Sequence, residues 1–354
     1  MPPSLDALEA SLLNASGNVK LDARFRTLFT LKGLGMAEEN RMRVIEIISK
    51  GFTDDSALLK HELAYVLGQL QDVRAIPKLE SVLSDTEEHA MVRHEAAEAL
   101  GAISSPTALP VLRKFLEDSD VSVRETCDLA VRKIELDNSD TGRKEAEIKA
   151  HQDAHGDARA AAAHAVPPID PAPAFVQVKA ADDAQPEVEN VYTLEKVPYF
   201  RSILLDEKRS LFDRYRAMFS LRNIVQRGGE AAAVPAIEAL AASLKDSSAL
   251  FRHEICFVFG ELCHPACIAA MTKVLDDPSE HEMVRHEAAE ALGGVLEESE
   301  DGPSAHEQVV ATLRRWADDE SAPRVVRESC IVALDEIAYN NDPTQFQRID
   351  TVDL

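Results

Sequence analysis

Several features that would place this 354-residue chain in other protein classes are scarce or missing. Aromatic residues make up only 5% of it, and no segment has a convincing strand pattern. No apolar run approaches the roughly 20 residues that a membrane-spanning helix needs, and the amino terminus lacks the basic and apolar regions of a signal peptide. These absences predict a soluble protein of the cytoplasm or nucleus that has no membrane partner.

Basic residues are also few in comparison with acidic ones. The chain has 38 Lys and Arg residues against 62 Asp and Glu residues, which gives a formal net charge of −24. Nucleic acid and anionic membrane surfaces would be repelled by this charge, whereas a polyamine or a Lys-rich protein loop would be attracted. The alternative explanation is that the negative charge serves only to keep the protein soluble. The five cysteines are odd in number and mostly lie in apolar helical patterns, which predicts reduced thiols.

The most informative feature is an internal duplication. Residues 60–70 read KHELAYVLGQL and residues 252–262 read RHEICFVFGEL, while MVRHEAAEALG occurs identically at 91–101 and 283–293. The same offset in chain position relates both pairs of segments. A shared offset over separate blocks indicates a duplicated half, and recurrence about every 33 residues within each half is typical of helical-repeat solenoids.

Weaker matches extend each half in both directions. Residues 23–34 match 213–224, and residues 123–131 match 326–334. Each half therefore contains four helix-pair units, and the chain is predicted to be an all-α, HEAT-like solenoid of eight units with pseudo-twofold symmetry. In the second and third unit of each half, which we call the inner units, one position is occupied by His. The first and fourth units, the outer units, carry other residues at this position, namely Phe25, Glu125, Tyr215 and Glu328.

Helical periodicity supports this fold class. In VRHEAAEALGAI at 92–103, apolar residues recur at steps of three and four and form one stripe. The preceding segment 76–85 is a second amphipathic helix, with Pro77 in the first turn, where proline is tolerated. Small residues such as Gly101 permit close packing against the next unit. The predicted organisation is an amino-terminal half at 1–137, an Ala/Pro-rich mobile linker at 138–198, a carboxy-terminal half at 199–340 and a tail at 341–354.

Four His-Glu pairs are the candidate functional residues. Each inner unit carries one pair, always at the same position of the repeat. Imidazole with carboxylate is a ligand set for iron, manganese or zinc. Each pair lies near a helix start, where the helix dipole disfavours a protonated imidazole. The two halves predict two metals in a symmetric site, although spacing alone does not say which glutamates ligate. The pairs are His61-Glu62, His94-Glu95, His253-Glu254 and His286-Glu287.

These repeats, pairs and spacings together resemble deoxyhypusine hydroxylase. The segments ALLKHELAYVLGQLQDVRAIPKL at 57–79 and LFDRYRAMFSLRN at 211–223 carry the same resemblance, which covers roughly 20–137 and 197–340. It implies a monooxygenase that uses O2 and two ferrous ions to hydroxylate a deoxyhypusine side chain on eukaryotic translation initiation factor 5A. A monomer is expected. The Ala/Pro-rich insert around 140–190 departs from the family pattern.

The resemblance also implies roles for individual residues. One iron would be bound by His61, His94 and Glu95, and the other by the equivalent residues of the second half, His253, His286 and Glu287. Glu62 and Glu254 would instead face the substrate and bind its amines. Two other functions remain open on the residues alone: a protein-binding scaffold without catalysis, and a dizinc hydrolase with similar ligands.

Overall fold

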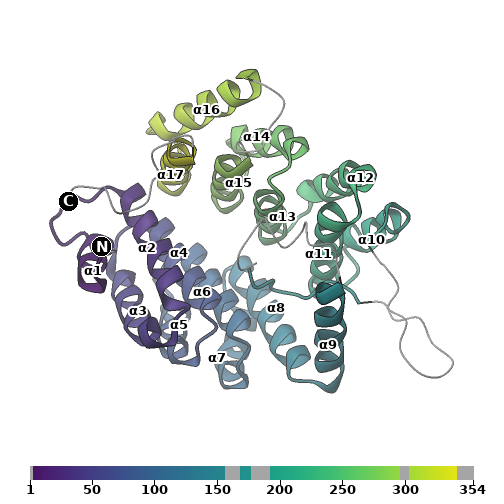
Figure 1. The fold of residues 1–354 in the computed structure, drawn as a ribbon, viewed down its shortest axis with the longest axis horizontal. Coiled ribbons are helices and arrows are strands. Elements are labelled where there is room, and N and C mark those ends of the chain that lie inside the picture. The colour runs from purple at the N-terminus through teal and green to yellow at the C-terminus, as the bar shows by residue number, and fades with distance from the viewer. Residues whose placement is uncertain (1–2, 156–167, 177–191, 296–302, 341–354) are drawn as a thin grey trace.

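In a computed structural model, the chain is described over residues 3–155, 168–176, 192–295 and 303–340. Within these ranges it folds into seventeen α-helices with short 3₁₀ turns and contains no strand (Figure 1). The predicted all-α fold is therefore confirmed. No helix in the described part of the chain has the length and apolar content to cross a membrane.

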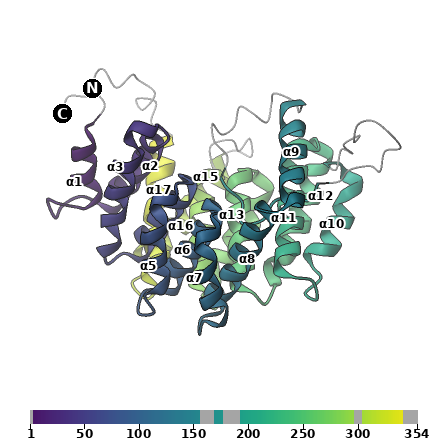
Figure 2. The same cartoon turned by 90° about the horizontal axis from the view of Figure 1, so that it is seen from below.

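The helices alternate between an inner and an outer set. The inner helices carry the repeated motifs and face the middle of the molecule, and most of them pack against the outer helix that precedes them in the chain (Figures 1 and 2). The inner helices are α2 (Leu21–Gly35), α4 (Ala57–Gln69), α6 (Ala90–Ile103), α8 (Val121–Asp137), α11 (Leu211–Arg227), α13 (Ala249–Leu262), α15 (Glu282–Val295) and α17 (Arg324–Asn340). The outer helices are α1 (Leu5–Leu12), α3 (Glu38–Lys50), α5 (Ile76–Ser84), α7 (Leu109–Lys114), α10 (Val197–Leu204), α12 (Glu230–Ala241), α14 (Ile268–Asp276) and α16 (Pro303–Asp318).

Local signals in the sequence set the helix ends. The hydroxyl of Ser56 accepts a hydrogen bond from the backbone N–H of Leu59 at 3.1 Å and so caps the start of α4. Pro77 lies in the first turn of α5, and that helix ends at Ser84, close to the predicted limits. The cap decides where α4 begins, and thus at which turn its His-Glu pair lies.

Small residues allow the inner helices to pack closely. A Cβ atom added at Gly68 of α4 would lie 2.8 Å from the Cα of Ala99 in α6, and one at Gly101 of α6 would lie 3.1 Å from the Cα of Ala130 in α8. Neither distance leaves room for a larger side chain. The predicted role of Gly101 in packing against the next unit is confirmed.

Buried arginines tie the inner helices to the outer ones. Arg93 of α6 donates from Nε to the carbonyl of Leu83 at 3.1 Å and pairs with Asp118 at 2.6 Å. Arg214 of α11 does the same with the carbonyl of Leu204 and with Asp246. Because a buried charge is stable only when it is paired and hydrogen-bonded, these contacts fix each inner helix relative to the loops around it.

The two halves meet at two junctions, so the inner helices form a closed ring. At one junction α8 packs against α11 and α13, and at the other α17 returns to pack against α2 and α4 (Figure 1). The second junction is strengthened by the ion pair between Arg324 and Asp55, at 3.2 Å. Ring closure brings the inner faces of α4, α6, α13 and α15 towards a common centre.

Part of the segment predicted as a mobile linker has defined structure. Within 138–198, residues 140–155 form helix α9 (Asp140–His155), and residues 168–176 form an irregular strap that packs between the halves. In this strap the Ile169 N–H donates to Gln69 of α4 at 2.9 Å, and Asp170 pairs with Arg222 of α11 at 2.6 Å. The sequence pattern missed the strap because it is held by individual polar contacts rather than by an apolar stripe. The rest of the insert, at 156–167 and 177–191, lies outside the described residues.

Candidate metal centre

All eight residues of the four His-Glu pairs are buried. The pairs lie on the first two turns of α4, α6, α13 and α15, which are the two central inner helices of each half. Burial of so many ionisable groups in one place is unfavourable unless they bind one another or a cation. The exposed fractions run from 0% to 7%, for His61, Glu62, His94, Glu95, His253, Glu254, His286 and Glu287.

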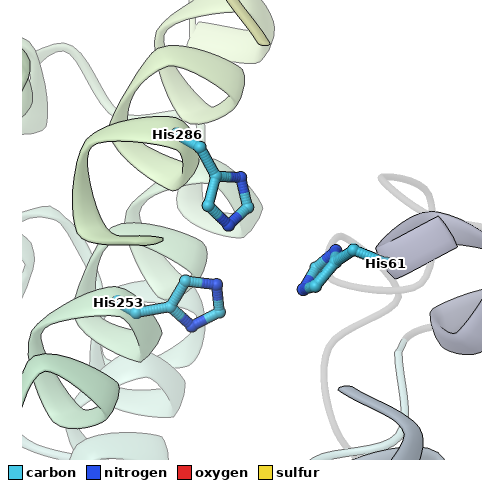
Figure 3. Close-up of side chains that lie close together, drawn as sticks. All are labelled: His61, His253 and His286. Carbon is cyan, nitrogen blue, oxygen red and sulfur yellow. The ribbon is translucent and has the colours of Figure 1, made fainter. Parts of the chain in front are cut away.

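The four imidazoles form a single cluster in which each ring lies beside one from its own half and one from the other half. His61 and His94 of the first half have ring centroids 5.4 Å apart, and His253 and His286 of the second half lie 5.3 Å apart. Across the halves, His61 is 5.1 Å from His286 (Figure 3). His94 is 5.4 Å from His253. The duplicated motifs are therefore brought together by the ring closure rather than by proximity in sequence.

Most ring nitrogens of this cluster are buried without a hydrogen-bond partner. Both nitrogens of His94 and of His253, and Nε2 of His61 and of His286, are in this state. An unsatisfied buried polar atom costs about 1–3 kcal/mol, so several of them in one cluster indicate a site that binds a ligand. Divalent metal ions bound by neutral imidazoles would satisfy these nitrogens, and the residues therefore fit a metal centre.

Two of the glutamates face the histidines of the neighbouring unit in the same half. Glu95 Oε2 lies 3.2 Å from His61 Nε2, and Glu287 Oε2 lies 3.3 Å from His253 Nε2. Neither contact has hydrogen-bond geometry. Carboxylate oxygens and imidazole nitrogens that lie close together without a hydrogen bond are placed as ligands of a shared ion would be.

Three groups of ligand atoms are close enough to hold an ion, with all atoms within 4.8 Å of one another. The first is the set expected for one iron, His61, His94 and Glu95. The second combines His61 with both histidines of the other half, and the third consists of His286, Glu287 and Glu290. The structure thus brings the six expected ligands into one cluster, and it adds a carboxylate that had not been expected.

Electrostatics differ among the histidines. Burial lowers the pKa of His94 and His286 well below its usual value, and the neighbouring imidazoles lower it further. Burial acts in the same direction on His61, but the carboxylates of Glu95 and Glu62 outweigh it and raise the pKa of His61. The neutral form of His94 and His286 is the form that binds metal.

The two glutamates expected to face substrate lie in different surroundings. Glu62 Oε1 is 3.0 Å from Nδ1 of its neighbour His61. Glu254 Oε1, by contrast, is buried without a partner. Burial raises the pKa of Glu254 well above its usual value, and the negative charge of Glu98 adds to the effect. A buried carboxylate in this state would be stabilised by a cation.

Sequence analysis missed a second carboxylate on two of the metal-bearing helices, α6 and α15. Glu290 Oε1 lies 3.3 Å from His286 Nδ1 and accepts a hydrogen bond from the Ser329 hydroxyl at 3.0 Å. Its counterpart Glu98 has a buried oxygen without a partner. The signal was present in the sequence, because a Glu four residues after a His lies on the same face of a helix. The repeated motif RHEAAEAL contains this spacing in both halves.

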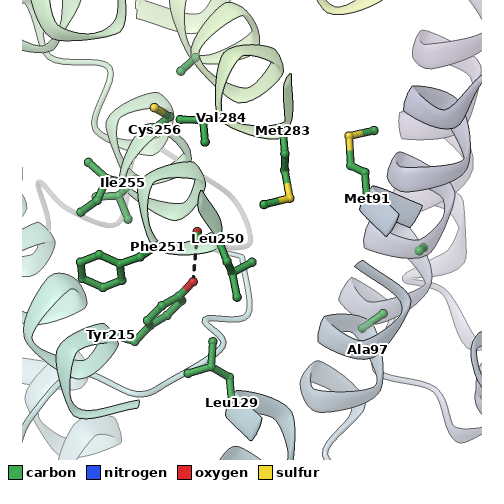
Figure 4. Close-up of a cluster of buried hydrophobic side chains, with 14 of the residues drawn as sticks. Met91, Ala97, Leu129, Tyr215, Leu250, Phe251, Ile255, Cys256, Met283 and Val284 are labelled. Atoms are coloured by element: carbon green, nitrogen blue, oxygen red, sulfur yellow. Dashed lines mark hydrogen bonds between the residues drawn. The ribbon is translucent and has the colours of Figure 1, made fainter. Parts of the chain in front are cut away.

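Apolar side chains lie on the amino-terminal side of the cluster. Met91 and Met283 occupy the turns before His94 and His286, lie opposite each other on the two halves, and are almost fully buried (Figure 4). Two histidines outside the cluster have another role: His89 and His281 accept hydrogen bonds from the backbone N–H groups of Met91 and Met283. These two histidines therefore cap α6 and α15.

Comparison with known proteins agrees with this architecture and places the chain in a family. The model for HEAT repeats matches residues 42–133 and 237–335. The chain is 58% identical to deoxyhypusine hydroxylase of Mycosarcoma maydis over 98% of both chains, and 42% identical to that of Candida albicans over 96% of this chain and 93% of the relative. The structure of human deoxyhypusine hydroxylase in complex with glycerol superposes with a TM-score of 0.71, at 43% identity, over 95% of this chain and 96% of the human chain. The chain therefore belongs to the deoxyhypusine hydroxylase family.

Proposed function

We propose that this chain uses O2 and a two-iron centre to hydroxylate the deoxyhypusine side chain of eukaryotic translation initiation factor 5A. The observation that carries the proposal is the cluster of four buried imidazoles from both halves, most of whose ring nitrogens have no hydrogen-bond partner. The family membership supplies the reaction class and substrate. The expected setting is the cytoplasm or nucleus, with the chain acting as a monomer.

Six residues would hold the two ions. We assign His61, His94 and Glu95 to one iron, and His253, His286 and Glu287 to the other. Two ferrous ions bound there would supply the electrons and the open coordination positions that O2 activation requires. Four positive charges would also offset the carboxylates, whose burial is otherwise costly.

The remaining pair of glutamates is suited to the substrate's amines. Deoxyhypusine carries protonated amines at neutral pH, and Glu254 offers a buried oxygen without a partner. Glu62 already contacts His61, so it would both orient that ring and bind substrate. We assign Glu254 as the stronger amine-binding carboxylate, since a charge-assisted hydrogen bond to it would have no competing partner within the protein.

The surroundings of the cluster would limit access of water. Met91 and Met283 are 2% and 1% exposed and face each other across the halves. An apolar wall strengthens each electrostatic contact inside the site, because it lowers the local dielectric constant. The aliphatic part of a modified lysine would also pack against these flexible thioether side chains.

Metal analysis combined with a product assay tests the proposal. The purified chain should contain close to two irons, and deoxyhypusine-bearing factor 5A should gain the mass of one oxygen atom in the presence of O2. The unmodified factor, which lacks the aminobutyl group, is the control and should not react. Two tightly bound zinc ions with no iron, or iron binding without oxygen transfer to the factor, would contradict the proposal.

A further inference from the structure

The two junctions between the halves contain the same hydrogen bond, made by residues that the metal centre does not use. At one junction the Ser248 hydroxyl donates to Glu125 Oε2 at 2.6 Å, and at the other the Ser56 hydroxyl donates to Glu328 Oε2 at 2.7 Å. In each case the serine belongs to one half and the glutamate to the other. We call these two contacts the junction clasps.

Each clasp serine caps a helix that carries a His-Glu pair. Ser56, five residues before His61, accepts at Oγ from the Leu59 N–H at 3.1 Å at the start of α4. Ser248, five residues before His253, accepts at Oγ from the Phe251 N–H at 3.0 Å at the start of α13. One hydroxyl therefore joins the first turn of a metal-bearing helix to a carboxylate of the opposite half.

The clasps are anchored from behind by further ion pairs. The N–H of Ser56 donates to Asp54, which pairs with the buried Arg24, and the N–H of Ser248 donates to Asp246, which pairs with the buried Arg214. The networks are equivalent in the two halves and extend from the outer helix to the junction. Burial of both serines, at 2% and 8% exposed, keeps water from replacing the carboxylate.

The position of the clasp glutamates in the repeat explains why they are not histidines. Glu125 and Glu328 occupy the position that holds His in the inner units. This position faces the centre in α4, α6, α13 and α15, but in α8 and α17 it faces the neighbouring half. In each half, the same position of the repeat thus provides a metal ligand in the two inner units. In the unit that follows them, it provides a contact with the other half.

We infer that Glu125 and Glu328 are positioning residues that hold the first His-Glu pair of the opposite half in place for metal binding. The inference rests on the proposed two-metal function. Glu328 fixes α4 and thereby His61 of one site, whereas Glu125 fixes α13 and thereby His253 of the other. Each metal site therefore depends on a carboxylate from the half that does not contain its helix.

Ferrous iron titration of the metal-free full-length chain under anaerobic conditions tests the inference. Glu328→Ala should weaken one of the two sites by about tenfold or more, and Glu125→Ala the other, a loss typical of contacts that orient metal ligands. Glu125→Gln and Glu328→Gln retain an acceptor oxygen and should restore most of the affinity. Glu135→Ala, which removes an exposed carboxylate of α8 that pairs with Arg113, is the matched control.

Hydrogen–deuterium exchange on the metal-free chain gives a readout that does not depend on iron. Glu328→Ala should speed exchange in the first turns of α4 but not of α13, and Glu125→Ala should do the reverse. Wild-type affinity at both sites in both alanine variants, or equal weakening of both sites with a general loss of protection, would overturn the inference. If the wild-type chain takes up fewer than two ions, the proposed function fails instead, and the exchange pattern still decides the role of the clasps.

Discussion

His61 and His286 come from opposite halves of the duplicated chain, yet their ring centroids are 5.1 Å apart, closer than the 5.4 Å between His61 and His94 of the same half. The histidines of opposite halves are therefore packed as closely as the histidines of neighbouring repeats. One consequence is that neither half alone would contain a complete cluster. The metal centre is a property of the closed ring of inner helices.

Removing a cluster histidine should release metal. His94→Ala deletes a fully buried ring whose two nitrogens have no partner in the protein, so its loss should lower iron content to well under two per chain and abolish hydroxylation. His264→Ala is the matched control, because His264 lies outside the cluster and accepts a hydrogen bond from the backbone N–H of Ala266. Elemental analysis of both proteins checks this. Full iron content in His94→Ala would show that this ring is not a ligand.

The glutamates should separate into two classes. Glu95→Ala and Glu287→Ala should lose iron, whereas Glu62→Ala and Glu254→Ala should keep it and bind substrate less tightly. One charge-assisted hydrogen bond contributes about 1.5–3 kcal/mol, so affinity should fall about ten- to a hundredfold. The larger loss is expected for Glu254, whose oxygen has no competing partner. Iron per chain and substrate affinity are measured for all four variants, and loss of iron in the second pair would reverse the assignment.

The carboxylate behind His286 should matter for metal affinity. Glu290 contacts His286 Nδ1, and this arrangement leaves Nε2 free for metal. Glu290→Ala should lower iron affinity about 10- to 100-fold, in the range found for residues that orient a ligand histidine. Ser329→Ala, which removes only the hydroxyl that donates to Glu290, should have a smaller effect in the same direction. Unchanged iron affinity in Glu290→Ala would show that His286 is oriented by packing alone.

The strap should stabilise the protein through its buried ion pair. Arg222 pairs with Asp170 at 2.6 Å and with Glu261 at 2.9 Å, so Asp170→Ala leaves a buried guanidinium with one carboxylate partner. The expected loss in free energy of unfolding is on the order of 3 kcal/mol. Asp140→Ala removes an exposed carboxylate that pairs with Arg143, and it should change little. Urea unfolding of both variants measures the difference, and equal stabilities would mean that the strap is not held by this pair.

The metal-free chain should lose stability as pH rises from about 4.5 to about 7. Burial raises the pKa of Glu261 from 4.5 to about 7, although Arg222 opposes the shift. Over this interval the unfolded chain releases a proton that the folded chain retains, which favours unfolding. Glu98 and Glu254 act in the same direction, because burial raises the pKa of each. Glu261→Gln should flatten the pH dependence of urea unfolding, and an unchanged slope would contradict the assignment.

The sequence by itself determined the helical-repeat fold and the identity of the ligand candidates. Both are periodic properties: apolar residues at steps of three and four define the helices, and a constant offset relates the halves. A position such as His94 could be singled out because the same residue recurs at the same place in the repeat as His286. Repetition carries information that a single His-Glu pair does not.

Only the tertiary structure decided which residues of the two halves meet. Sequence offset relates His61 to His253, but the structure places His61 closest to His286, because ring closure sets the halves face to face. The strap and the junction clasps were equally hidden, since Asp170 and Arg222, or Ser56 and Glu328, are far apart in the chain and share no periodicity. Such pairings depend on the closure of the solenoid, and closure is fixed by packing and polar contacts at the two junctions rather than by any local pattern.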